Sequence, residues 1–450
     1  MTDTETDKQL WGGETAKAVE NFPISGETVP VSVVRWLARL KGAAAAVNGE
    51  LGLLDKRRAG RIEKAAAEIG AGKHDAQFPI DVFQTGSGTS TNMNANEVIA
   101  KLATDRDPAR PVHANDHVNM GQSSNDVFPS AVHLAALDVA SNELLPALKQ
   151  LERAFAKKAK SFENVVKAGR THLMDAVPVT LGQEFAGYAA QMALGQERVQ
   201  AALVHVGQIP LGGTATGTGL NTHPRFAQKV RARLKKESGL KQIAPPADPF
   251  EAQANRDALV ELSGALKVVA VSLTKIAGDL ALMGSGPRAG IGELFLPELQ
   301  KGSSIMPGKV NPVMPEVMLQ VCAQVIGNDT AITVAGMQGQ FELNVRIPLI
   351  ARNLLQSLRL LSSASRALAE KCVDGLRANR AGTDASAGAT LAVATALNGA
   401  IGYDLGAAIV KKATDTGRPL REVALEEGVD AKLYDETIDL RRIARGNQAR

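Results

Sequence analysis

The chain has 450 residues, which suits two or three domains, and its 44% hydrophobic and 22% charged residues are typical of a globular protein rather than a disordered one. The 51 basic and 47 acidic residues are interspersed and give a net charge of +4, a mixed pattern that argues against a nucleic-acid partner. Aromatic residues are only 4% while Ala and Leu are abundant, which favours helices over sheets.

The N-terminal segment and the cysteines indicate the cellular compartment in which the protein is expected. MTDTETDKQL is polar and acidic, unlike the apolar core of a signal peptide or the Arg-rich start of a transit peptide. We find no apolar stretch of the roughly 20 residues that a membrane span requires. Cys322 and Cys372 lie in apolar helical patterns, which predicts buried free thiols. We therefore expect a cytoplasmic protein with no membrane partner.

Residues 1–121 are predicted to form a mixed, mainly helical N-terminal domain. Two helical patterns, around Val31–Leu54 and Lys56–Ala71, precede a segment rich in Gly, Ser, Thr and Asn at Phe78–Asn94. Gly and small polar residues are typical of a loop whose backbone approaches a ligand.

Residues 122–376 are predicted to form a bundle of long helices. Apolar residues from Leu259 to Leu280 recur at alternating steps of three and four, and the pattern ends at Gly284-Ser285-Gly286-Pro287. Similar stripes begin at Leu144, Phe185 and Leu354. Stripes on more than one face favour a bundle shared between subunits, with a monomeric bundle as the alternative. Residues 377–450, broken by several Gly and Pro residues, are predicted to form a small C-terminal helical domain.

The first candidate loop is TGSGTSTNMNANE at residues 85–97, which offers the hydroxyls of Ser87 and Thr89. Its Gly86-x-Gly88 pair resembles part of a dinucleotide loop, but no strand pattern precedes it and no third Gly follows in register. A polar loop with helix-capping residues explains this segment equally well.

The second candidate loop is HANDHVNMGQSSND at residues 113–126. Ser123, Ser124 and Asn125 precede a helical pattern, and a helix N-terminus can bind a carboxylate, although plain N-capping also accounts for them. His113 and His117 have a spacing that a metal could use on a helix. The composition predicts a loop there and supplies no third ligand, so we expect no metal.

Two further loops carry ionisable groups. In GRTHLMDAVPVTLGQE, residues 169–184, His172 precedes a predicted Pro-containing loop, and it becomes a candidate acid or base if a carboxylate orients it. In GSSIMPGKVNPVMPE, residues 302–316, the turn Pro307-Gly308 presents Lys309 with Asn311, a cation and an amide that suit a small dicarboxylate. Glu316 falls in the first turn of the next predicted helix.

These segments carry a family resemblance. GSSIMPGKVNP resembles the signature of the fumarase/aspartase superfamily, and TGSGTSTNMNANEV, NMGQSSNDVFPS, GRTHLMDAVPVTLGQEF, GGTATGTGLNTHP and QFELNV resemble the other blocks of class II fumarases in the same order. The resemblance runs from about Leu10 to about Ile409. Aspartases usually carry Gln where His172 stands, so this block favours a fumarase.

The resemblance implies an all-α, fumarase/aspartase-like fold with a long central helical bundle, and a homotetramer whose active sites are each built by three subunits. It implies the reversible hydration of fumarate to L-malate, a step of the citric acid cycle, with no metal and no organic cofactor. An aspartase-like sister lyase and a catalytically silent scaffold protein are the alternatives. His172 argues against the first, and the intact set of candidate catalytic residues argues against the second.

The resemblance also implies roles for individual residues. Ser303 is the base that takes the C3 proton of malate, on a mobile loop that closes over the substrate. His172, oriented by Glu316, handles the water or the leaving hydroxide. The substrate-binding residues are Ser87, Thr89, Ser123, Ser124, Asn125, Thr171, Lys309 and Asn311. A secondary anion site is implied at His113, Asn115 and Asp116.

Overall fold

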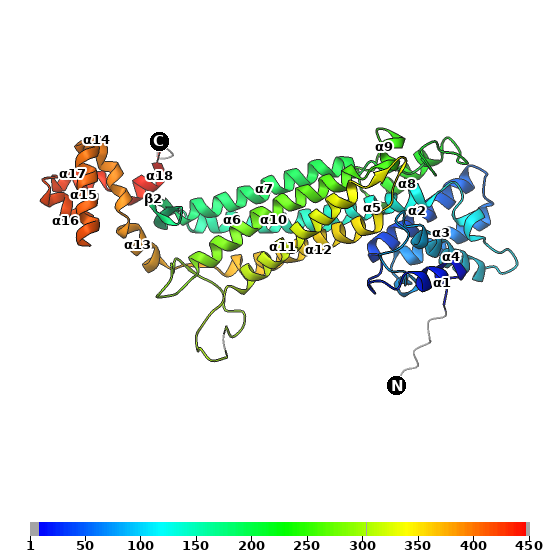
Figure 1. Ribbon diagram of the computed structural model, residues 1–450, viewed down its shortest axis with the longest axis horizontal. Helices are drawn as coiled ribbons and strands as arrows, with labels where there is room; N and C mark the ends of the chain where they lie inside the picture. Colours follow the sequence, from blue (N-terminus) through cyan, green and yellow to red (C-terminus); the bar gives the residue numbers. More distant parts are fainter. Residues whose placement is uncertain (1–8, 303, 447–450) are drawn as a thin grey trace. The chain divides into compact units, whose positions relative to one another are not determined.

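The computed structural model describes residues 9–302 and 304–446, and they are mainly helical, which confirms the all-α prediction (Figure 1). The described chain forms two compact units. The first comprises Met1–Pro146, Gly195–Ala270 and Val321–Ser362, and the second comprises Ala147–Leu194, Val271–Gln320 and Ser363–Arg450. These units are discontinuous in sequence, so the predicted three-part division of the chain stays a prediction.

The first unit holds several shorter helices. They are α1 (Gly13–Asn21), α2 (Val31–Glu50), α3 (Lys56–Gly70), α4 (Thr89–Asp105), α5 (Ser124–Val139), α8 (Phe226–Ser238) and α9 (Pro249–Ala254), with the turns η1 (Asp75–Gln77), η2 (Ala114–Val118) and η3 (Ala140–Leu144). The strands β4 (Gly339–Gln340) and β5 (Leu343–Asn344) pair antiparallel.

Small residues let α2 pack closely against its neighbours in this unit. It contacts α3, α5 and α8, and a Cβ on Gly42 would lie 3.0 Å from the Cβ of Ala66 on α3. The side chain of Asp55 accepts hydrogen bonds from the backbone N–H groups of Arg57 and Arg58, so it caps α3 and defines its start. The two predicted helical patterns in this region are therefore confirmed.

Five long helices have residues in both units: α6 (Leu145–Ser161), α7 (Leu181–Val206), α10 (Asp257–Met283), α11 (Val313–Gly336) and α12 (Ile347–Lys371). The predicted stripe from Leu259 to Leu280 is buried, and α10 ends at Met283, just before the predicted stop. Within the first unit, Ser263 of α10 donates to Asp329 of α11 over 2.7 Å. The predicted helix packing is therefore confirmed.

The second unit contains an antiparallel hairpin and the C-terminal helices. Strands β1 (Val166–Thr171) and β2 (Met174–Thr180) form the hairpin, and β3 (Leu294–Phe295) pairs antiparallel with β6 (Arg377–Ala378). The remaining elements are η4 (Val373–Gly375), η5 (Leu391–Leu397), α13 (Arg380–Ala389), α14 (Asn398–Ile401), α15 (Tyr403–Thr416), α16 (Leu420–Glu426), α17 (Ala431–Thr437) and α18 (Leu440–Arg445).

A group of aromatic rings packs in the core of the second unit. Phe162 meets Phe185 edge to face with ring centroids 5.3 Å apart, and Tyr188 donates a hydrogen bond of 2.8 Å to Asp279 on α10. The hydrogen bond joins α7 to α10, and the ring contact packs the residue after α6 against α7. Elsewhere in the chain, Cys322 and Cys372 are buried and outside any disulfide, as predicted.

The expectation that no apolar stretch is long enough to span a membrane is wrong for one helix. Helix α11 is long and apolar enough to cross a bilayer, by length and composition alone. Its polar residues are nevertheless bonded to other helices, since Asn328 donates to Ser357 of α12 over 3.0 Å and Asp329 accepts from Lys267 of α10 over 2.6 Å. About a third of the apolar window of α11 (33%) is buried within one copy of the chain. A cytoplasmic location stays a prediction.

Candidate active site

The loop before α4 is fixed by close backbone contacts. The carbonyl of Gly86 accepts a hydrogen bond of 3.0 Å from the backbone N–H of Ile347, and a Cβ on Gly86 would lie 1.6 Å from the carbonyl oxygen of Val345. Gly88 has a φ of +77°, and a Cβ there would lie 2.2 Å from the ring of Phe128. Both glycines are therefore required by packing, which gives them a role other than binding a dinucleotide.

This loop places two of the predicted substrate-binding hydroxyls together. Thr89 is the first residue of α4, and its hydroxyl lies 2.7 Å from that of Ser87. Ser87 is buried and Thr89 is half-buried.

The N-terminus of α5 carries the next three predicted residues. Ser123 is the N-cap, and it forms a capping box in which the Ser123 N–H donates to Asp126 over 2.9 Å. Asn92 donates to the hydroxyl of Ser124 over 3.0 Å, and Asn125 donates to the carbonyl of Ala215 over 2.9 Å. The capping interpretation therefore holds for Ser123, whose hydroxyl accepts from the Asn125 N–H over 3.2 Å.

A buried carboxylate holds a glycine-rich loop against this helix end. Asp126 is fully buried, and its Oδ2 accepts from the backbone N–H groups of Gly212 over 2.9 Å and Thr214 over 3.1 Å. Burial raises the pKa of Asp126 to about 6, although three backbone N–H donors act in the opposite direction. The segment GGTATGTGLNTHP is thereby positioned by α5.

A buried cation lies behind the same residues. Lys41 of α2 is fully buried, and its ammonium donates to the amide oxygens of Asn119 and Gln122, each over 3.1 Å. Asn92 also donates to Asn119, over 3.3 Å. Burial lowers the pKa of Lys41 to about 7, and the charge of Asp126 opposes this shift. Lys41 therefore supports the hydrogen-bond network that reaches Ser124.

The sequence interpretation missed Lys41, Asn119, Gln122 and the buried role of Asp126. A signal for Lys41 was present, because it lies within the run Leu40-Lys41-Gly42-Ala43-Ala44, where α2 is otherwise apolar and small. A lysine on the buried face of a helix requires a polar partner.

In the second unit, Thr171 and His172 lie at the tip of the hairpin. Thr171 pairs with Met174, so His172 and Leu173 form a two-residue turn in which their φ angles are 55° and 61°. Two positive φ angles are the mark of a type I′ turn, which usually takes Asn-Gly. The predicted Pro-containing loop is wrong here, because Pro178 lies within strand β2. His172 and Thr171 are exposed.

Buried ion pairs hold the base of this hairpin. Lys167 pairs with Glu184 over 2.7 Å and with the fully buried Glu293 over 3.2 Å, and Arg170 pairs with Glu293 over 2.9 Å. Burial raises the pKa of Glu184. The strands that carry Thr171 and His172 are therefore anchored to the rest of the second unit.

The signature loop closes on itself in the same unit. Asn311 donates a hydrogen bond of 2.7 Å to the carbonyl of Gly302, and a Cβ on Gly302 would lie 1.8 Å from the carbonyl oxygen of Lys309. Lys309 and Glu316 are exposed, with Glu316 in the first turn of α11. Ser303 lies outside the described residues. Among the described residues of one copy, no hydrogen bond joins His172 to Glu316.

The predicted secondary anion site lies on η2, a π-helical turn rather than the expected loop. The Nδ1 atom of His113 accepts from the backbone N–H of Asp116 over 3.1 Å, and that of His117 accepts from the N–H of His113 over 2.8 Å. His113, Asn115 and Asp116 are exposed on this turn. The helical turn thus brings both histidines close, but each Nδ1 is engaged by the backbone.

Comparison with known proteins identifies the family. The family described as "Lyase" matches residues 2–327, and "Fumarase C C-terminus" matches residues 393–445. The chain is 55% identical over 434 residues to the class II fumarate hydratase of Corynebacterium efficiens, covering 96% of this chain and 91% of the relative. It is 54% identical over 435 residues to that of Mycobacterium tuberculosis, with 96% and 91% covered.

Solved structures agree with the sequence relatives. The class II fumarase from Schistosoma mansoni superposes with a TM-score of 0.95 at 38% identity, covering 97% of this chain and 96% of that one. The fumarate lyase:delta crystallin from Brucella melitensis superposes with a TM-score of 0.93 at 44% identity, covering 97% of this chain and 96% of that one. The chain therefore belongs to the class II fumarate hydratase family of lyases.

Proposed function

We propose that the chain catalyses the reversible addition of water to fumarate to give L-malate, the reaction in its family's name, at a site that needs no metal. The observation that carries this proposal is the N-terminus of α5. There Ser123, Ser124 and Asn125 are proposed to line the substrate pocket. The Ser124 hydroxyl accepts from Asn92 and keeps its proton to donate to a substrate oxygen, while Lys41 and Asp126 hold its surroundings in place. A dicarboxylate suits such a helix end.

We assign binding of one carboxylate to this helix end together with Ser87 and Thr89. Lys309, Asn311 and Thr171 are assigned to the rest of the substrate. Lys309 is exposed and therefore available to an anion, and Asn311 keeps its amide oxygen for a ligand because its N–H group closes the loop on Gly302.

The chemistry explains why these residue types are needed. The C3 proton of malate is weakly acidic, and its removal places a second negative charge on the adjacent carboxylate as an aci-carboxylate. A nearby cation such as Lys309 stabilises that charge. Ser303 is the proposed base, and a serine needs a desolvated site to act as one. His172, oriented by Glu316, is proposed to protonate the departing hydroxide, directly or through a water.

The arrangement of these residues favours a site shared between subunits. Within one copy His172 and Glu316 are not hydrogen bonded among the described residues, so we assign their contact to different subunits of a homotetramer. Apolar side chains on the long helices stay exposed in one copy and would be covered in such an assembly; they include Val268, Val271, Leu282, Val317, Ile326 and Val334. We keep His113, Asn115 and Asp116 as a proposed secondary anion site.

A direct assay tests this function. L-malate and L-aspartate are added separately to the purified protein in EDTA, and the ultraviolet absorbance of fumarate is followed. A rise with malate alone is expected. A rise with aspartate alone would make the chain an ammonia lyase. No rise with either, from folded protein, would favour the silent-scaffold alternative.

A further inference from the structure

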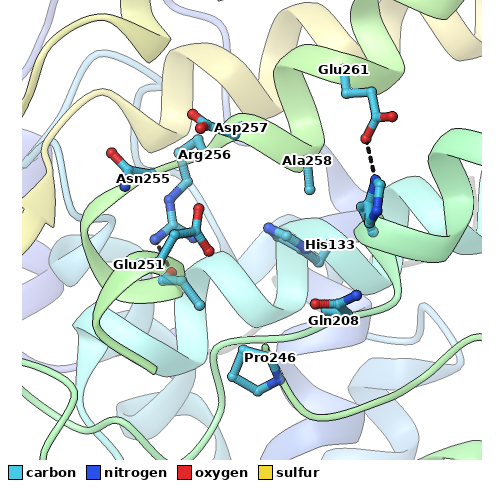
Figure 2. A pocket seen from close by; sticks show the side chains of 11 residues that line it. His133, Gln208, Pro246, Glu251, Asn255, Arg256, Asp257, Ala258 and Glu261 are labelled. Atoms are coloured by element: carbon cyan, nitrogen blue, oxygen red, sulfur yellow. Dashed lines mark hydrogen bonds and ion pairs between the residues drawn. The ribbon is translucent and has the colours of Figure 1, made fainter. Parts of the chain in front are cut away.

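A cavity of about 410 Å³ lies in the first unit, apart from every residue assigned to fumarate above. Figure 2 shows side chains from α5, the end of α7, α9 and the start of α10 around it. The residues that matter for its chemistry are His133, His205, Glu251, Arg256, Asp257 and Glu261.

His133 supplies a buried acceptor to this cavity. The side chain is 4% exposed, and its Nδ1 lies 2.9 Å from the backbone carbonyl of Val206. A carbonyl only accepts, so Nδ1 carries the proton and Nε2 is left as an acceptor. Burial lowers the pKa of His133 to about 3, which keeps the ring neutral. Nε2 has no hydrogen-bond partner among the described residues.

Arg256 supplies buried donors to the same cavity. The side chain is 1% exposed, and its Nη2 donates to the backbone carbonyls of Ala252 and Gln253. Its Nε and Nη1 atoms have no partner within the part of the chain that is described. Burial lowers the pKa of Arg256 to about 10, so it remains a cation at neutral pH. Buried donors without partners are rare in native proteins, and they point to a ligand or ordered water.

The rim of the cavity is acidic. Glu251, Asp257 and Glu261 are exposed, and Glu261 is bonded to His205 Nδ1 over 2.6 Å. Burial raises the pKa of Glu251, and the like charge of Asp257 adds to this effect. A positively charged group entering the cavity would relieve that repulsion.

We propose that this cavity binds a small amino acid as a zwitterion, with the carboxylate against Arg256 and the ammonium against His133 Nε2 and the acidic rim. An anion alone would face three carboxylates, and a cation alone would leave the Arg256 donors unpaired. A metal ion is disfavoured because the described residues contain no group of three or more His, Cys, Asp or Glu side chains able to hold one. A zwitterion satisfies all of the unpaired groups together.

Isothermal titration of the whole purified protein tests this assignment. The probes are L-alanine, L-serine and L-glutamine, with propylamine and propionate as compounds that carry one charge each. Saturable binding of at least one amino acid is expected. The two single-charge compounds should bind about tenfold or more weakly, because each loses charge-assisted hydrogen bonds.

Matched variants locate the binding. His133→Asn keeps a donor for the Val206 carbonyl but removes the Nε2 acceptor, and Glu251→Gln removes a rim charge; each should weaken binding, the first by about tenfold. Glu436→Gln, an exposed carboxylate outside the cavity, should bind like the parent. Fumarate hydration by each variant reports that it is folded.

Three results would overturn the proposal. The first is the absence of saturable binding for all three amino acids, which would mean a cavity filled by solvent. The second is binding that His133→Asn and Glu251→Gln leave unchanged. The third is propylamine or propionate binding as tightly as the amino acids, which would make this a simple cation or anion site.

Discussion

The ammonium of Lys41 donates a 3.1 Å hydrogen bond to the amide oxygen of Asn119, which also accepts from Asn92 over 3.3 Å. Asn92 in turn donates to Ser124 at the N-terminus of α5. A side chain buried in α2 is thus connected through two amides to a proposed substrate-binding hydroxyl. This connection makes Lys41 a positioning residue for the proposed site.

Replacing Lys41 with Met should raise the KM for fumarate by about tenfold, because the amide oxygens of Asn119 and Gln122 lose their donor. kcat should fall by a smaller factor than the KM rises, since Lys41 does not touch the reacting atoms. Steady-state kinetics at pH 7 measures both. Lys229→Met, which removes an exposed lysine paired with Glu50, is the control. An unchanged KM in the Lys41 variant would disprove the positioning role.

The stability of the protein should rise with pH through the range set by Lys41. Its pKa is lowered from 10.5 to about 7, so the native state binds fewer protons than the unfolded state between these values. Between pH 7 and pH 9 the free energy of unfolding of the parent should rise by about 2 kcal/mol more than that of Lys41→Met. Urea unfolding of both proteins at the two pH values measures this gain. Parallel pH profiles would mean that Lys41 is not the titrating group.

Substituting Gly86 with Ala should destabilise the first unit. The new Cβ would lie 1.6 Å from the carbonyl oxygen of Val345, so the loop or its neighbour must move. The free energy of unfolding should fall by about 1–3 kcal/mol. Activity should also be lower, because Ser87 and Thr89 shift. Gly60→Ala on α3, where a Cβ meets nothing within 4 Å, is the matched control and should be neutral or stabilising. Equal unfolding midpoints for the two variants would contradict the packing argument.

Replacing His172 with Asn should lower kcat by roughly 10²–10⁴-fold, the usual contribution of a general acid or base. Asn tolerates the positive φ of 55° at this turn position, so the hairpin should survive the change. Circular dichroism and thermal unfolding should therefore match the parent. A loss of less than about threefold, far below the catalytic range, would make His172 a turn residue only.

Replacing Ser303 with Ala should abolish turnover while the oligomer stays intact, because the change removes only the proposed base. Size-exclusion chromatography and the fumarate assay together test this expectation. Full activity in the variant would remove Ser303 from the mechanism.

Local patterns in the sequence were enough to predict the helices and the family. The stripe from Leu259 to Leu280 repeats with the period of a helix, and the stop at Gly284 is a local signal, so both were read from neighbouring residues alone. The hairpin at His172 was missed, because strand pairing and a type I′ turn formed by His and Leu have no strong local signature.

The burial of charged groups was decided only by the tertiary structure. Lys41 is buried because α2 packs against α3, α5 and α8, and Asp126 is bonded to Gly212, 86 residues away along the chain. The cavity beside His133 exists because α5 lies near the start of α10, and Arg256 immediately precedes α10. Helical periodicity is a property of adjacent residues, whereas the partner of a buried charge depends on which distant segments pack together, and that follows from side-chain packing in three dimensions.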